Sequence, residues 1–391
     1  MAGRIHAQMR QGGGGSAAGR IRQYCDISGP RMGGWRSSWP KRHSREWCSH
    51  TKRVDIIAER STITQSVQIG VELTPGTAVA ANKRLGSMGF AIGTETEISP
   101  LRPIGQKYPS LQILGKEWSE ADLEGSPVYT ELPYAFASLM NAPQVSQIMD
   151  GPTPTGAYLW TFESNTYGDD NPVTFTVEQG SSFRAHRVSN CILKEYTMEW
   201  SREEIELSGT WLARAIEDGI TLTPGPTALQ QIPVKPSDLS VYLDTTPTDI
   251  GTTKMLRALK GEFNIEDRFE PLWVVDREQP SFAAVIEGEP TVEFKMTMMA
   301  DAQAMASLNS MRNGTTSFLR LEGVGPIIYT PTEGDPIRHR MVIDLAGQVS
   351  EVAPFDDEDG VYAIEWTFAT VHDPEWGRAY RAMVTTTTAS L

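Results

Sequence analysis

A segment in the first half of the chain recurs in the second half, and this repeat constrains the fold more than any other feature. Residues 83–110 align without gaps to residues 254–281, an offset of 171 positions. Seven of the 28 aligned positions are identical, against about two expected from ordinary residue usage. An internal repeat of this kind predicts a duplicated domain. The identities pair Lys83, Leu85, Glu95, Pro100, Leu101, Pro109 and Ser110 with Lys254, Leu256, Glu266, Pro271, Leu272, Pro280 and Ser281.

The bulk composition is that of a globular protein with room for more than one core. The chain has 391 residues, of which 39% are hydrophobic and 21% are charged, and this length allows two or three domains. It contains no run of about 18 apolar residues, so we expect no membrane span.

Charge is divided unevenly along the chain. Residues 1–53 hold 11 Lys and Arg against 2 Asp and Glu, a net charge of +9. The remaining residues hold 24 basic and 47 acidic side chains, a net charge of −23. Because an acidic surface repels nucleic acid, we do not expect the main body to bind DNA or RNA.

Residues 1–53 lack hydrophobic periodicity and contain glycine runs, so we expect them to be a disordered basic leader. They also lack the apolar core of a secretory signal. Three interpretations are open: a transit peptide, a basic arm for nucleic acid, or upstream sequence included by an over-long gene prediction. We favour the third, because Trp35, Trp39 and Trp47 fit no obvious design in a structureless arm.

Alternation of polar and apolar residues indicates strands through most of the remaining chain. One long hairpin is expected over residues 196–211, with its turn at 202–204. A second is expected over residues 341–368, with its turn at 356–360. Because every second side chain is apolar, each sheet should bury one face and expose the other.

One short helix is expected in each half. Residues 131–140 carry Pro133 in the first turn, where a helix tolerates it, and residues 301–313 end at an Asn-Gly pair. The Gly- and Pro-containing residues 100–127 predict a long loop, with a shorter counterpart at 271–292. Loops of this length inside a compact domain are usually functional.

Each half therefore has the order strands, long loop, helix, strand, long hairpin. The strand after each helix is expected at Tyr158–Glu163 and at Thr316–Glu322. We predict a mainly-β fold with minor α content, in which two tandem domains of β-sandwich or half-barrel type each carry one short helix and a long loop. The predicted divisions are a leader at 1–53, a first domain at 54–222, a Pro-rich linker at 223–236, a second domain at 237–376 and a flexible tail at 377–391.

We predict no enzyme, and no catalytic, cofactor-binding or metal site. His186 lies near Ser181 and Ser182, but no nucleophile-elbow motif frames them, which disfavours a hydrolase. His339 stands between two arginines and is expected to be solvated. The cysteines lack the spacing of a zinc site or a disulfide framework, and they are Cys25, Cys48 and Cys191.

Acidic clusters are interpreted as structural. Residues 356–359 lack the ligand spacing of a calcium loop and are expected to form a solvated turn, and residues 169–170 are expected to form another turn. Strand alternation would split the carboxylates near the first hairpin turn between two faces, which disfavours a glycosidase pair at Glu203, Glu204 and Glu206. A run of methionines is expected in the core of a strand, at Met296, Met298 and Met299.

Several short segments resemble one protein family. They are VELTPGTAVA at 71–80, EGSPVYTELPY at 124–134, TFTVEQG at 174–180, SREE at 201–204, GITLT at 219–223 and DEDGVY at 357–362. Together they resemble the major tail tube proteins of long, non-contractile-tailed bacteriophages, and the likeness covers about residues 62–373. It consists of family-wide sequence character without catalytic signatures, so no site residue is carried over. Residues 1–53 depart from the pattern.

The resemblance implies a structural virion protein. Single-domain relatives assemble as hexameric rings, so a chain with a doubled domain would form a trimer with six pseudo-equivalent domains. Stacked rings would form a tube that conducts phage DNA without binding it specifically and that holds the tape-measure protein. Tail terminator and initiator proteins are further expected partners. The expected location is the virion, with assembly in the host cytoplasm, and deletion of residues 1–53 should leave assembly intact.

Two other function classes stay open. A β-sandwich adhesin, or another phage-encoded surface-binding structural protein, would be a monomer with a glycan or protein ligand. A β-rich hydrolase would need a concave pocket with convergent titratable groups, which the sequence does not offer. Rings or tubes in negative-stain microscopy would distinguish the tube subunit from both.

Overall fold

The computed structural model describes residues 65–300, 311–358 and 360–391. The structure is 56% strand and 5% helix, which confirms the predicted mainly-β class. These described residues all belong to one compact unit. The leader predicted at 1–53 lies outside the described residues.

The first half of this unit has short and long strands around one helix. In chain order its elements are β1 (Ser66–Val71), β2 (Lys83–Leu85), β3 (Gly89–Leu101), β4 (Leu111–Gly125), α1 (Leu132–Leu139), β5 (Gln144–Asp150), β6 (Thr153–Glu163), β7 (Phe175–Gly180), β8 (Ala185–Trp200), β9 (Ile205–Ala213) and β10 (Glu217–Ile220). Helix α1 confirms the helix predicted at 131–140, with Pro133 in its first turn. The hairpin predicted at 196–211 is confirmed as β8 and β9.

The second half begins with a short strand in the Pro-rich segment. Its elements are β11 (Thr227–Ala228), η2 (Pro236–Asp238), β12 (Leu239–Asp244), η3 (Pro247–Asp249), β13 (Ala258–Glu266), β14 (Phe269–Leu272), β15 (Ala284–Glu287), β16 (Thr291–Met299), β17 (Ser317–Tyr329), β18 (Ile337–Val352), β19 (Asp356–Glu358), β20 (Val361–Thr370) and β21 (Tyr380–Thr386). Strands β18 and β20 confirm the second predicted hairpin. Of the second predicted helix, residues 301–310 lie outside the described residues, and 311–313 are helical.

Both halves repeat one order of antiparallel strand pairing. The first half has the order β1–β7–β8–β9–β4–β3, and β10 pairs with the start of β8. The second half has the order β12–β17–β18–β20–β16–β13, and β21 pairs with the first part of β18. The 171-residue offset also holds in space: Lys83 pairs with Ile69 of β1, and Lys254 bridges to Tyr242 of β12. The sequence repeat is therefore also a repeat of topology.

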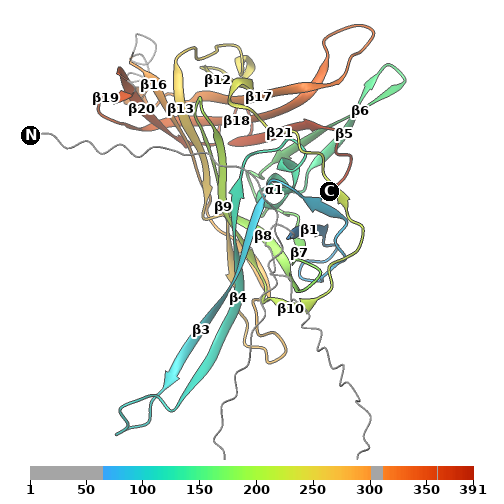
Figure 1. Cartoon of the computed structure of the whole chain (residues 1–391). Coiled ribbons are helices and arrows are strands. Elements are labelled where there is room, and N and C mark those ends of the chain that lie inside the picture. The colour runs from blue at the N-terminus through green and yellow to red at the C-terminus, as the bar shows by residue number, and fades with distance from the viewer. Residues whose placement is uncertain (1–64, 301–310, 359) are drawn as a thin grey trace, which may run out of the picture. The chain divides into compact units, whose positions relative to one another are not determined.

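One antiparallel sheet runs through both halves. Its strand order is β3–β4–β9–β8–β13–β16–β20–β18, and β8 and β13 form the junction between the halves (Figure 1). One face of this sheet packs on the core, where Trp211, Trp366 and Phe263 are fully buried. Most buried apolar side chains of both halves belong to one main hydrophobic cluster, and each large one contributes about 1.5–3 kcal/mol relative to an exposed position.

The structure does not divide at the predicted domain boundaries, 54–222 and 237–376. Strand pairs join the halves at β8–β13 and at β6–β21, and the core is shared. The predicted linker, 223–236, is also held in place. Strand β11 pairs with β2, and the buried Val234 donates its N–H to the Pro127 carbonyl at 2.9 Å.

The segment predicted as a flexible tail, residues 377–391, contains an interior strand instead. Strand β21 lies between β18 and β6 and pairs with both. Tyr380, Ala382 and Val384 of this strand are buried. The alternating pattern in the sequence is short and continues into a row of polar threonines, which suggested a loop. Threonine is β-branched, however, and therefore also fits a strand.

The long loop predicted at 100–127 is mostly strand β4, which forms a long hairpin with β3. Only residues 102–110 connect the two strands. Pro100 fits because β3 is an edge strand, where a missing N–H breaks no ladder on the open side. The hairpin projects beyond its neighbours (Figure 1). The counterpart predicted at 271–292 is likewise largely the short β14–β15 hairpin.

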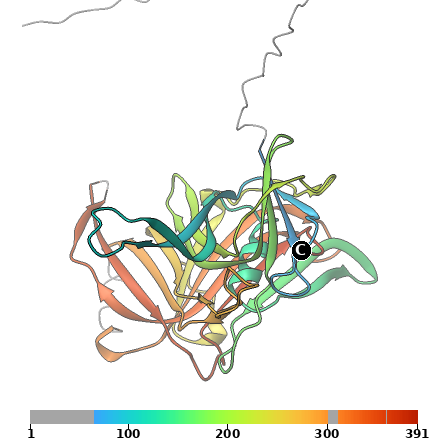
Figure 2. The ribbon, with the colours of Figure 1, turned by 90° about the horizontal axis from the view of Figure 1, so that it is seen from below.

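The strands predicted after the two helices exist, as parts of β6 and β17, but they are not counterparts. Strand β7 occupies in the first half the place that β17 occupies in the second. The β5–β6 hairpin is therefore an addition to the first half. It projects from the remaining strands in both views (Figure 1 and Figure 2).

Candidate assembly interface

The junction between the halves is a strand pair with a specific fit. Residues 196–200 of β8 pair with residues 261–265 of β13. The Thr197 hydroxyl donates to Asn264 Oδ1 at 2.9 Å across the pair. Gly261 permits the close approach, because a Cβ there would lie 2.6 Å from the Lys295 carbonyl and would also collide with the Trp200 ring.

The counterparts of these two strands have open edges. Strand β3 corresponds to β13 and pairs with β4 on one side. Strand β18 corresponds to β8. Beyond Gly347, where the pairing with β17 ends, its residues 348–352 pair with β20 on one side. Among the described residues no strand lies on the other side of either, although Gln179 Nε2 donates to the Phe90 carbonyl of β3. The chain thus leaves open the same two edges that it joins internally.

The sheet face turned away from the core is acidic. Its carboxylates alternate with buried side chains and include Glu120, Asp122, Glu124, Glu195, Glu199, Glu206, Glu262, Glu293 and Glu365. Two lysines share this face. Lys260 Nζ donates to Glu358 at 2.8 Å, and this hydrogen bond raises the pKa of Lys260. Lys295 pairs with Glu262 at 3.1 Å, so both cations are neutralised locally and the negative excess remains.

The far part of the β3–β4 hairpin is exposed and apolar. In the connecting segment, Ile104 is 106% exposed and Tyr108 is 68% exposed. Exposed apolar surface of this kind marks a contact site in a soluble protein. Exposed apolar side chains continue down both strands, on one face at Ile98 and Leu114 and on the other face at Leu101, Leu111 and Ile113.

The corresponding hairpin of the second half, β14–β15, is covered at its base, whereas Leu272, Val274, Val275 and Ile286 are exposed. Phe269 and Phe282 are buried in a small cluster with Ile192 of β8 and Leu212 of β9. The second half therefore buries the base of its hairpin on the first half. The β3–β4 hairpin has no partner of this kind within the described chain.

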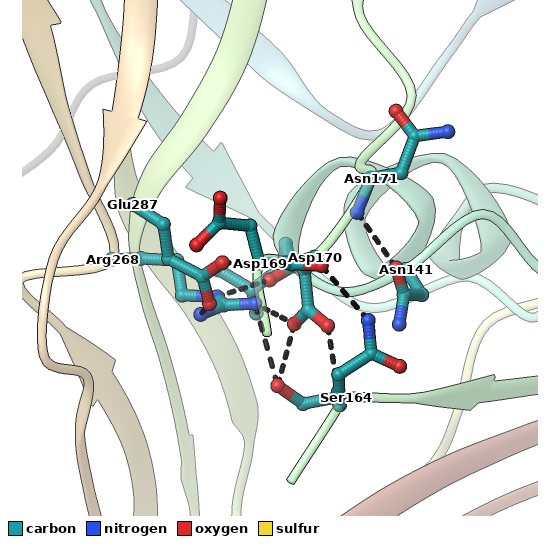
Figure 3. A network of polar contacts seen from close by, with 9 residues as sticks. Asn141, Ser164, Asp169, Asp170, Asn171, Arg268 and Glu287 are labelled. Carbon is teal, nitrogen blue, oxygen red and sulfur yellow. Dashed lines mark hydrogen bonds and ion pairs between the residues drawn. The ribbon is translucent and has the colours of Figure 1, made fainter. Parts of the chain in front are cut away.

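Arg268, between β13 and β14, fixes this contact (Figure 3). Its buried guanidinium forms ion pairs with Asp170 and Glu287, and its Nε donates to the Leu139 carbonyl of α1 at 2.8 Å. Asp170, predicted as a turn residue, is thus a buried ion-pair partner whose side chain is fully enclosed. A buried charge needs such partners, because its desolvation is otherwise not offset.

Comparisons with protein-family models and with curated proteins gave no match to this chain. The open edges, the acidic face and the two hairpins are therefore the basis on which its function is inferred.

The side chains considered for hydrolysis are not brought together. His186 Nε2 lies 3.3 Å from Gln179 Oε1, and burial lowers the pKa of this imidazole. The Ser181 hydroxyl instead accepts the Phe183 N–H at 3.3 Å. In the described part of the chain, neither Ser181 nor Ser182 is hydrogen-bonded to His186.

His339, expected to be solvated, is 3% exposed. Its ring packs on Tyr129 with the centroids 5.7 Å apart, and burial lowers its pKa. The expectation failed because neighbouring residues of a strand face opposite sides. Arg338 and Arg340 are exposed, and the histidine between them points into the core.

The other clusters behave as structural groups. Residues 356–358 form β19, so the solvated turn predicted at 356–359 is largely a strand. No group of three or more metal-binding side chains occurs in the described ranges. Met296 and Met298 are buried, as predicted, whereas Met299 is only partly buried. Burial raises the pKa of the Cys191 thiol. Among the described helices, none is long and apolar enough to cross a membrane.

Sequence reasoning missed two buried carboxylates with equivalent roles. Glu72, directly after β1, accepts the Gly76 N–H at 2.7 Å and the Asn190 N–H at 2.9 Å. Asp244, at the end of the corresponding β12, accepts the Gly251 N–H at 2.8 Å. The available signal was an acidic residue that ends the first strand of each half and precedes a glycine-containing turn.

Proposed function

We propose that this chain is the repeating subunit of a ring, and that stacked rings form a tube of the bacteriophage tail type. The observation that carries the proposal is the β8–β13 junction. It joins inside one chain the two kinds of edge that β18 and β3 leave open. In a ring, β18 of each copy pairs with β3 of the next.

Such a contact uses two different surfaces, so it is head-to-tail, and a head-to-tail contact closes into a ring when its rotation permits. Closure also removes the aggregation hazard of exposed sheet edges. Three copies would supply six topologically similar halves, which accords with the trimer implied by the family resemblance.

The acidic face supports a channel for a polyanion. If it lines the lumen, its carboxylates keep DNA from adhering, because each unneutralised negative charge opposes the phosphates. DNA and a tape-measure protein would then pass or rest inside without a specific site. The apolar hairpin segment at 102–110 supplies a contact to the next ring.

The test uses edge variants of the full chain. The Phe90 carbonyl of β3 faces outward, since it accepts from Gln179, and every second residue repeats this direction, so the Thr94 N–H also faces outward. Thr94→Pro removes that donor without removing a β4 hydrogen bond, and Thr94→Val is the matched control.

We expect rings from the wild type and from Thr94→Val in negative-stain microscopy and in light scattering after gel filtration. Thr94→Pro should remain a folded monomer with an unchanged circular dichroism spectrum. A wild-type chain that stays monomeric at high concentration would overturn the proposal.

A further inference from the structure

The β3–β4 hairpin and the segment that leads into the β14–β15 hairpin carry opposite charges at one equivalent position. In the 171-residue register, Glu97 corresponds to Arg268. Both lie at an irregularity in the pairing: the register of the continuous strand β3 with β4 shifts between Thr96 and Ile98, and Arg268 lies in the break between β13 and β14. The geometry of the chain at these two positions is thus related, while the charge is reversed.

The partner position is reversed as well. Asp170, which pairs with Arg268, lies five residues before β7 at Phe175. The corresponding strand of the second half is β17, and five residues before its start at Ser317 lies Arg312. The pair Arg268–Asp170 therefore has Glu97 and Arg312 as its counterparts.

Neither counterpart is enclosed in the single chain. The Glu97 side chain is 58% exposed and has a loose contact with Lys116 at 3.7 Å, and Arg312 is exposed. The apolar neighbour of Glu97 is also exposed. Ile98, at 48%, corresponds in the same register to Phe269, which is buried on the first half.

We propose that Glu97 of one copy pairs with Arg312 of the next, with Ile98 packed beside them on its second half. This inference rests on the proposed ring and names a contact within it. The occupant is a second copy, because the chain itself shows how such a hairpin docks and because the charges are complementary.

Charge reversal at both positions gives each hairpin one acceptable partner. If β14–β15 docked on the second half of another copy, Arg268 would meet Arg312. If β3–β4 docked on a first half, Glu97 would meet Asp170. Like charges opposed in a contact suppress the wrong pairing, so copies join in order without exchanging hairpins.

A charge-swap series in the full chain tests this pair. Glu97→Arg and Arg312→Glu each place like charges together and should weaken ring association about tenfold or more. The double variant E97R/R312E restores an opposite pair and should recover association to near the wild-type level. Glu97→Gln removes the charge without placing a second cation beside Lys116. Glu270→Arg, at an exposed position of β14, changes the net charge as Glu97→Arg does and is the control for net charge.

Association is measured by analytical ultracentrifugation, and folding by thermal denaturation. If the wild type forms rings but both single reversals assemble equally well, or the double variant shows no recovery, the pair is wrong and the ring stands. If the wild type forms no rings at all, both inferences fail.

Discussion

Arg268 links three parts of the chain that lie far apart in sequence. Its guanidinium reaches a loop of the first half, a strand of the second half and the end of α1. The two carboxylates and the carbonyl offset a desolvation penalty of several kcal/mol. Removing the arginine would leave Asp170 and Glu287 as uncompensated negative charges, and that loss is more costly than the net value of the ion pairs.

Arg268→Ala is therefore expected to lower the free energy of unfolding by about 3–5 kcal/mol. Urea denaturation followed by tryptophan fluorescence measures this change. Arg277→Ala, at an exposed position between β14 and β15, should change stability by less than about 0.5 kcal/mol. Equal effects at the two positions would contradict the role assigned to Arg268.

His339 gives a pH dependence with a defined sign. Burial lowers its pKa in the folded state below the ordinary value of about 6.5, so the unfolded chain binds the proton more readily. The contribution of His339 is fully present above pH 6.5 and is lost as the pH falls through that value toward the folded pKa.

His339→Phe should flatten the fall in stability below pH 6.5, measured as the unfolding midpoint at a series of pH values. The exposed His372 is the position for a control substitution. A parallel fall in His339→Phe and wild type would show that other groups cause it.

At the residue scale, alternation alone located the core side chains of β8, namely Tyr196, Met198 and Trp200, all buried. The environment of Asp170 was not predictable, because its partner Arg268 lies 98 positions away in sequence. Long-range charge pairs leave no local pattern in a single sequence.

At the scale of elements, the hairpins and α1 follow from period-2 and capping signals, whereas the β3–β4 hairpin and β21 were misjudged. Gly and Pro between 100 and 127 suggested a loop, but an open edge tolerates both, as Pro100 opposite Gln112 demonstrates. The β-propensity of single residues is a weak guide at the edge of a sheet, because a partner outside the chain can complete the strand pairing.

Replacing residues 102–110 by a short Gly/Ser link should leave the chain folded and able to form rings but prevent their stacking. Ring and tube populations in electron micrographs measure this outcome. A variant with Ile104→Ser and Tyr108→Ser, which keeps the loop length, should shorten tubes in the same direction. Tubes of normal length from both variants would remove this segment from the stacking contact.

At the scale of the molecule, the repeat predicted two domains, whereas the described structure has one core crossed by two strand junctions. A repeat in sequence reveals the shared topology of the halves. It does not reveal how much surface the halves bury against each other, because that depends on packing partners outside either copy.

The shared core predicts one cooperative unfolding transition for the wild-type chain. Calorimetry should give equal calorimetric and van't Hoff enthalpies for the main transition, since neither half retains a closed core alone. Two resolved transitions, or two stable fragments after proteolysis within residues 223–236, would show that the halves unfold independently.

The position of β21 has a consequence for synthesis. This strand occupies the space between β6 and β18, yet it is synthesised after both of them. A nascent chain therefore exposes two unsatisfied strands until translation has passed residue 386. If the chain forms the proposed ring, a chain without β21 should stay out of it, because its shared core is still open.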